Sequence, residues 1–435
     1  MMGYHGGVHG QAISIMKRAT DAAAQGIADG FDLRNLPPEF YRNPFPYYAA
    51  LQAESPVKRL PDGAYIVTRY ADAEFVYKNP KIFSSDKQQE FGAKYGATPL
   101  FEHHTTSLVF NDPPFHTRVR RLINGALTPR AIAQIEPDLI ALVDRLIDAM
   151  AAKTSIDLIE DFAAAIPVEV IGNLLGVPRA ERERLRNWSL AILGALEPSL
   201  TPDAAGRGNS AVREFAAYLD VLIERRRRTP LGPDSDLISC LLHGGYDGQS
   251  LSAAELTHNC IFLLNAGHET TTNLIGNGLV ALAEHPEQRD RLIADPNLIK
   301  SAVEEFLRYE SPNQLGNRIT TQPVRLGGID LAAGTQITVC IGAANRDPEQ
   351  FGAPDELDIG RSPNRHLAFA SGIHQCVGMA VARLEAATAI SALIRRFPRY
   401  SLASAPTRGG RVRFRGFLKI PCNLGSESTM HPAMR

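Results

Sequence analysis

The sequence predicts a mainly helical protein with short β-hairpins, and three stretches support this fold class. Apolar residues recur at helical spacing through residues 131–245, as in amphipathic helices. Ser252 and Glu255 match a capping box and open a helix predicted to run unbroken to His285. Residues 57–70 alternate around the turn residues Pro, Asp and Gly and are predicted to form a β-hairpin.

Composition limits the classes of protein to consider. The 46 basic and 47 acidic residues nearly balance, so no nucleic-acid partner is expected. The five cysteines include no C-x-x-C pair, which argues against a zinc site or a disulfide framework and fits a reducing, cytoplasmic location. No signal-sequence pattern and no apolar run of about 18 residues occurs, so no membrane anchor is expected.

No linker separates independent units along the chain. We therefore expect a loosely ordered segment over residues 1–40, one domain over 41–422 and a flexible tail over 423–435. Residues 86–108 mix glycine, proline and aromatic residues and are predicted to form a long irregular loop. Its adjacent His103 and His104 are not expected to bind a metal, because ligand sets need three or four converging donors.

The densest chemical pattern is FASGIHQCVGMAVAR, at residues 369–383. Cys376 precedes a predicted helix, whose free N–H groups and dipole would favour a thiolate. Gly372 and Gly378 flank the thiol and let the backbone approach a flat, bulky group. A lone cysteine is more often a buried structural residue, so the argument depends on the whole pattern.

This pattern resembles the haem-binding signature of the cytochrome P-450 family, the haem–thiolate monooxygenases. The resemblance implies haem b with Cys376 as the axial iron ligand, and cofactor contacts from Phe369, His374 and Gly378. Ala370 departs from the pattern, since many members have glycine there. The implied fold is mainly α with small β-sheets on one side, and the haem lies between a long central helix and the cysteine loop.

The middle of the long predicted helix reads AGHETTT, at residues 266–272. Ala266 and Gly267 leave room for a flat cofactor, and the Thr270 hydroxyl can donate to the Ala266 carbonyl and loosen the helix. Alone, such a cluster is more often a packing notch. Beside Cys376 it resembles the family's acid–alcohol pair, which implies that Glu269 and Thr270 deliver the protons needed to cleave the O–O bond.

Cationic residues complete the resemblance. His116 and Arg120 lie one turn apart on a predicted helix and, taken alone, could equally mark an ordinary basic surface. The resemblance implies that both bind the haem propionates, with Arg318 as a further arginine. It also matches Glu305 and Arg308 to the family's E-x-x-R motif and implies Arg361 as their structural partner, which would hold the cysteine loop.

The implied reaction converts R–H, O₂, two electrons and two protons into R–OH and water. No reductase domain is evident, so electrons are expected from NAD(P)H through a ferredoxin or flavodoxin-type carrier and its reductase. This carrier would dock near Cys376, where Arg118 and Arg121 lie. A peroxide-driven peroxygenase and a haem sensor without turnover stay open as alternatives; a cysteine hydrolase is less favoured, because no histidine base or nucleophile elbow surrounds the thiol.

The substrate is expected to be an organic small molecule, of medium size for that class, with one polar end. Its pocket is predicted to draw residues from four parts of the chain, namely 86–108, 185–205, 313–317 and Phe417.

Overall fold

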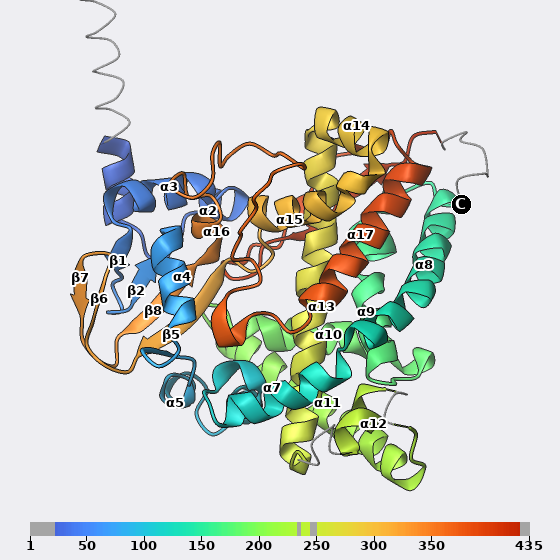
Figure 1. Cartoon of the computed structure of the whole chain (residues 1–435), viewed down its shortest axis with the longest axis horizontal. Helices are drawn as coiled ribbons and strands as arrows, with labels where there is room; N and C mark the ends of the chain where they lie inside the picture. The colour runs from blue at the N-terminus through green and yellow to red at the C-terminus, as the bar shows by residue number, and fades with distance from the viewer. Residues whose placement is uncertain (1–21, 233–235, 244–249, 427–435) are drawn as a thin grey trace, which may run out of the picture.

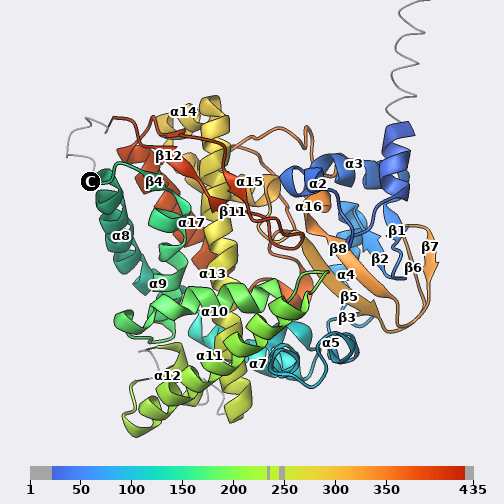
Figure 2. The ribbon, with the colours of Figure 1, turned by 180° about the vertical axis from the view of Figure 1, so that it is seen from behind.

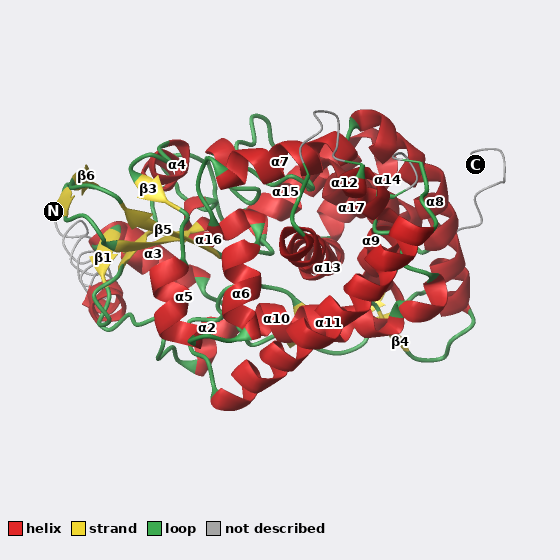
Figure 3. Cartoon of the chain, turned by 90° about the horizontal axis from the view of Figure 1, so that it is seen from below, coloured by secondary structure: helices red, strands yellow, loops and turns green. Residues whose placement is uncertain are grey.

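The computed structural model describes residues 22–232, 236–243 and 250–426. Helices dominate and surround one long helix, α13 (Ala253–Glu284), which runs the height of the molecule in Figure 1. Seen from below, α13 is viewed end-on among other helices, and most strands gather to one side (Figure 3). The predicted fold class, mainly α with small β-sheets, is confirmed.

The other helices follow in chain order. They are α2 (Pro38–Arg42), α3 (Phe45–Glu54), α4 (Tyr70–Lys78), α5 (Gln88–Tyr95), α6 (Pro99–Thr106), α7 (Phe115–Ala126), α8 (Pro129–Ala151), α9 (Ala165–Leu174), α10 (Glu183–Gly194), α11 (Pro202–Arg228), α12 (Leu237–Leu242), α14 (Pro286–Ala294), α15 (Ile299–Tyr309), α16 (Ile341–Ala344) and α17 (Met379–Arg396).

The start of α13 shows why the sequence forms this helix. The Ser252 hydroxyl accepts a hydrogen bond from the Glu255 N–H (3.2 Å), and the Glu255 carboxylate accepts one from the Ser252 N–H (2.8 Å). This is the predicted capping box. With 32 residues, α13 is about 48 Å long at 1.5 Å per residue. Figure 2 shows α10 and α11 crossing α13 on the face seen from behind.

The largest sheet has five strands in the order β1–β2–β8–β5–β3. Strands β1 (Val57–Arg59) and β2 (Tyr65–Val67) form the predicted antiparallel hairpin, and β2 continues parallel to β8 (Gln336–Cys340). Strand β5 (Leu315–Thr320) pairs antiparallel with β8 and with β3 (Phe83–Ser84). The sheet therefore holds Arg318 at a fixed place on β5.

Smaller sheets complete the fold. They are β6 (Val324–Leu326) with β7 (Ile329–Leu331), β10 (Thr407–Arg408) with β11 (Phe417–Lys419), and β4 (Ile156–Asp157) with β12 (Pro421–Asn423) and β9 (Ser401–Leu402). Within the described ranges, no helix is both long and apolar enough to cross a membrane.

The prediction of an irregular loop at residues 86–108 is wrong. Helices α5 and α6 occupy most of it, and the residues that suggested a loop mark their ends. Gly96 closes α5 with a positive φ of 62°, and Pro99 stands in the first turn of α6, where a missing N–H costs nothing.

The expectation of loose ends fails where the structure describes them. Residues 22–29 are helical, and Ala28, Phe31, Leu33 and Phe40 are buried in one hydrophobic cluster with the first strands. At the other end Asn423 belongs to β12 and Leu424 is buried. The remainder of both predicted segments, residues 1–21 and 427–435, lies outside the described residues.

A buried ion-pair network ties α15 to the segment that leads to Cys376. Both side chains of Glu305 and Arg308 have no exposed surface, and two hydrogen bonds of 2.8 Å join them. Arg361 adds bonds of 3.1 and 3.2 Å to the same carboxylate. The guanidinium groups also donate to backbone carbonyls of residues 345–356. Because the N–H groups of both guanidinium groups have acceptors, the buried charges are compensated. The network therefore fixes the path of the chain that leads to Cys376.

Candidate active site

A cavity of about 350 Å³ lies between α13 and the segment from Ala368 to Glu385. Most of its wall is apolar, as in sites for small organic ligands. Three of the four parts of the chain predicted to line the pocket do so, through residues such as His104, Leu193 and Asn313. The fourth does not: Phe417 packs in the hydrophobic core beneath Arg408, and Phe414 lines the cavity instead.

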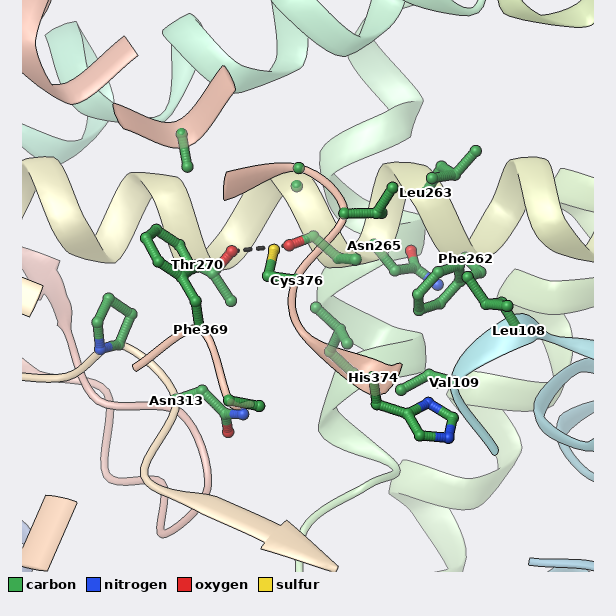
Figure 4. Close-up of a pocket in the computed structure, with 18 of the residues that line it drawn as sticks. Leu108, Val109, Phe262, Leu263, Asn265, Thr270, Asn313, Phe369, His374 and Cys376 are labelled. Carbon is green, nitrogen blue, oxygen red and sulfur yellow. Dashed lines mark hydrogen bonds between the residues drawn. The ribbon is translucent and has the colours of Figure 1, made fainter. Parts of the chain in front are cut away.

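The loop that presents Cys376 is closed by backbone hydrogen bonds. The Cys376 N–H donates to the Phe369 carbonyl (2.9 Å), and Phe369, His374 and Gly378 line the cavity with the thiol. A Cβ built on Gly378 would meet no atom within 4 Å, so the missing side chain leaves open space beside the sulfur. In Figure 4, Cys376 and Thr270 belong to the same cavity but come from different elements, the loop and α13.

The expected bias of Cys376 toward the thiolate does not hold for the protein chain alone. Burial raises the pKa of the Cys376 thiol, and the Gly378 N–H and the Arg120 and Arg383 guanidinium groups oppose this only in part. The reason is that an anion without a close cation is costly to bury. A cationic centre bound to the sulfur would offset this cost.

Ala370 carries backbone strain in this loop. Its φ of 55° lies in the left-handed region, where a Cβ is unfavourable and glycine is not. Gly372 has a φ of 71°, and a Cβ there would lie 2.3 Å from the Tyr77 carbonyl oxygen. The loop therefore requires glycine at 372 and carries the strain of alanine at 370.

On the opposite wall, the Thr270 hydroxyl donates to the Ala266 carbonyl over 2.7 Å. Ala266 and Thr270 both line the cavity. Gly267 lines it as well, but a Cβ there would lie 2.1 Å from Cδ1 of Ile171 on α9. The missing side chain of Gly267 thus lets α9 pack close to α13, and its expected approach to the cofactor stays a prediction.

Glu269 does not join Thr270 at the cavity wall. Its Oε1 accepts a 2.5 Å hydrogen bond from Arg411, a residue of the C-terminal segment, and Oε2 is buried without a partner. Arg411 also donates to the Leu190 carbonyl on α10. Burial raises the pKa of Glu269 although Arg411 opposes the shift. The expected acid is thus buried next to the cavity, in an ion pair that sequence reasoning missed.

The three residues expected to bind carboxylates, His116, Arg120 and Arg318, lie together with His374, which was expected as a further cofactor contact. Arg120, Arg318 and His374 line the cavity, and the rings of His116 and His374 have centroids 4.1 Å apart. Neither guanidinium forms an ion pair with a carboxylate of the described residues. Both ring nitrogens of His116 and Nε2 of His374 are buried without partners.

Burial and neighbouring positive charges lower the pKa values of both histidines. Burial, with the charges of Arg120 and Arg318, lowers the pKa of His116 to about 4. Burial, with Arg318 and His116, lowers that of His374 to about 2. Donors that lack partners and positive charges that lack counterions together form a site for an anion.

Two polar residues of the cavity wall were missed from the sequence. Glu385, on α17, has no cation nearby, and burial raises its pKa to about 8. Asn265, on α13, is 3% exposed, and neither atom of its amide has a partner. Each of these residues interrupts the apolar face of its helix, and this interruption was the only feature of the sequence that could have identified it.

Comparison with known proteins gives a consistent picture. The family model for Cytochrome P450 matches residues 57–400. The chain belongs to the cytochrome P450 family.

The family's individual members agree along nearly the whole chain. "Biotin biosynthesis cytochrome P450" from Bacillus subtilis (strain 168) is 38% identical, over 84% of this chain and 92% of its own. "Vitamin D(3) 25-hydroxylase" from Pseudonocardia autotrophica is also 38% identical, over 89% and 96% respectively. The structure of P450BioI with an acyl carrier protein ligated to hexadec-9Z-enoic acid superposes with a TM-score of 0.83 at 36% identity, over 88% of this chain and 99% of that chain. This chain is therefore a cytochrome P450 monooxygenase, an oxidoreductase.

Membership of the P450 family implies a haem-iron cofactor, and the cavity fits one. Cys376 supplies one soft ligand, and no group of three or more His, Cys, Asp or Glu side chains in the described ranges could hold a metal unaided. A macrocycle that brings its own nitrogen ligands matches this donor set. The unpartnered donors around Arg120 and Arg318 match its two carboxylates, and the open space at Gly378 leaves room for its flat face.

Relief of strain at Ala370 should stabilise the P450. We predict that Ala370→Gly raises the free energy of unfolding by about 0.5–1 kcal/mol, because glycine adopts a positive φ without a Cβ clash. Gly372→Ala is the matched control and should be destabilising. Urea unfolding of the three proteins tests this, and a loss of stability in Ala370→Gly would show that the loop is not strained there.

Glu385 should make stability depend on pH. Its pKa is about 8 in the folded chain and near its ordinary value of 4.5 when unfolded, so stability falls as pH rises from about 4.5 to about 8. We predict that Glu385→Gln melts close to wild type near the acidic end of this window and progressively higher than wild type toward the alkaline end. Melting curves across the window measure this, and a pH-independent difference would contradict it.

Proposed function

We propose that this P450 uses O₂ and two electrons from an external carrier to hydroxylate, or otherwise oxidise, a small and mostly apolar molecule in the cavity. The carrier would be a ferredoxin or flavodoxin-type protein that draws, with its reductase, on NAD(P)H. The observation that carries the proposal is the position of Cys376 and Thr270 in one cavity, on the cysteine loop and the central helix. The relative named as a hydroxylase supports the same reaction class.

The residues that line different parts of the cavity would have different roles. Bound haem would supply the iron centre at which O₂ is activated. The Cys376 sulfur would hold that centre from the loop side, and Arg120 and Arg318 would fix its carboxylates. The apolar wall would exclude water from the reacting carbon atom.

Thr270 would help to deliver protons from the cavity wall that α13 forms. Its hydroxyl already donates to the Ala266 carbonyl, so its oxygen lone pairs face away from that bond and can accept a proton donor in the cavity. Glu269 precedes Thr270 in the sequence, and its carboxylate accepts a hydrogen bond from Arg411 and does not line the cavity. Proton delivery by Glu269 would therefore require its side chain to leave Arg411, which couples proton supply to movement of the C-terminal segment and α10.

The carrier is proposed to dock on the face near Cys376. Arg118, one of the two arginines expected to attract it, donates to the Glu255 carboxylate at 2.5 and 3.2 Å and to the Ser250 carbonyl. Arg118 thus also stabilises the start of α13, and the basic groups of that face, Arg118 and Arg121 among them, are proposed to attract the carrier by their charge.

A peroxide-driven reaction is the second candidate, and the ion pair of Glu269 with Arg411 favours it. Peroxide brings the oxygen atoms already reduced, so fewer protons must be delivered. Comparing product formation with peroxide and with O₂ plus a surrogate carrier system separates the two. Equal or faster turnover with peroxide would favour the peroxygenase.

The role of Thr270 gives the sharper test. We predict that Thr270→Ala lowers product formed per reductant consumed by roughly tenfold, while reductant consumption continues. Thr272→Ala is the matched control, because Thr272 makes the same type of bond, to the His268 carbonyl (2.9 Å), but does not line the cavity. Product and NAD(P)H are measured together, and unchanged coupling in Thr270→Ala would contradict the proton role.

A further inference from the structure

We propose that the Asn265 amide recognises the substrate, and that the substrate is a neutral, largely apolar molecule bearing a hydroxyl or similar group that both donates and accepts hydrogen bonds. This inference rests on the proposed function and names the substrate class of that site.

Asn265 has an unused donor and an unused acceptor at the cavity wall. The residue is 3% exposed, and Oδ1 and Nδ2 are both buried without a partner. It precedes Ala266 on α13 and lines the cavity. A buried amide left unpaired is unfavourable, so a ligand that satisfies both atoms gains affinity.

Other asparagines of the same helix show what a structural amide does here. Asn259 donates to the Glu255 carbonyl (2.8 Å) and accepts from the Leu108 N–H (2.9 Å). Asn277 donates to the carbonyls of Glu310 and Arg415 over 3.0 Å each. These two amides join α13 to other segments. Asn265 makes no such bond, which sets it apart as a ligand-binding group.

The surroundings of Asn265 are apolar. Phe262, Leu263, Leu108 and Val109 line the cavity with it (Figure 4). One polar group in an apolar wall orients a ligand more than it attracts polar molecules in general. The ligand is therefore mostly hydrocarbon, with its polar group directed at Asn265.

The charges of the wall argue against a carboxylate ligand. The Arg413 guanidinium donates hydrogen bonds to the Leu196 and Leu315 carbonyls (3.3 and 2.8 Å) and to Oδ1 of Asn317. Arg120 and Arg318 belong to the end of the cavity assigned to the cofactor carboxylates.

The histidines of the wall do not replace these arginines. Burial lowers the pKa of His104 to about 3 and that of His103 well below its ordinary value, so both are neutral. The described lining residues thus leave no free cation for a substrate carboxylate, and burial of an unpaired carboxylate is costly.

Spectral titration of the haem-loaded full chain tests this inference. The probes share one alkyl chain: 1-dodecanol, its methyl ether, which only accepts, and dodecanoate, which is charged. We expect wild type to bind the alcohol about tenfold more tightly than the ether or the acid, from the shift of the haem to high spin. Failure to bind the alcohol, or equal binding of the acid, would overturn the proposal.

Two leucine variants locate the effect. Asn265→Leu should lose about tenfold in affinity for the alcohol and should bind the ether at least as well as wild type. Asn313→Leu is the matched control on another part of the wall; its Oδ1 is also buried without a partner, but the residue is half-buried and its Nδ2 is not among the unpartnered buried atoms, so the change should be under threefold. An equal loss in both variants, or none in Asn265→Leu, would overturn the role of Asn265.

A further variant and the haem spectrum separate failure of the Asn265 assignment from failure of the proposed function. Asn265→Ala is the second variant should the leucine disturb folding, and it should show the same loss for the alcohol. A protein that takes up no haem refutes the proposed function itself. A protein with a normal haem spectrum and unchanged ligand preference refutes only the assignment to Asn265.

Discussion

The structure depends on holding one cysteine sulfur at a fixed place opposite a long helix. Burial disfavours an anion at Cys376 in the chain alone, and a cationic centre bound to the sulfur would offset this cost. The buried carboxylate of Glu305 and the guanidinium groups of Arg308 and Arg361 fix the chain that leads to this loop. On the other side, 32 residues of unbroken helix place Thr270 without a flexible connection. Rigid support on both walls is what a reaction at a fixed centre requires.

The polar groups of the cavity wall fall into a charged set and a neutral set. Arg120 and Arg318, with His116 and His374, form an end rich in unpaired donors, which suits a dianionic cofactor. The wall at Asn265 has hydrogen-bonding capacity but no free cation among the described lining residues. We propose that this difference in charge separates the cofactor from the substrate. The ion pair with Arg411 holds the Glu269 carboxylate away from the cavity wall.

Much of the fold and of the candidate site could be predicted from the sequence, because the patterns involved residues close together in the chain. The capping box of Ser252, the hairpin at residues 57–67 and the i to i+4 relation of Ala266 and Thr270 involve neighbours in the chain. The loop predicted at residues 86–108 failed because glycine and proline also end and begin helices. The contact of Gly267 with Ile171 and the ion pair of Glu269 with Arg411 could not be predicted, because these partners are distant in sequence. No pattern along one chain reveals such contacts, nor that the Asn265 amide is left unpaired.

The most direct test of the account is the spectrum of the reduced protein with carbon monoxide. Wild type should show the long-wavelength Soret band that thiolate ligation gives to haem. Cys376→Ser should lose this band, and Cys422→Ser should keep it, because Cys422 is buried on β12 and does not line the cavity. A band retained in Cys376→Ser, or absent from wild type that has bound haem, would contradict the central claim.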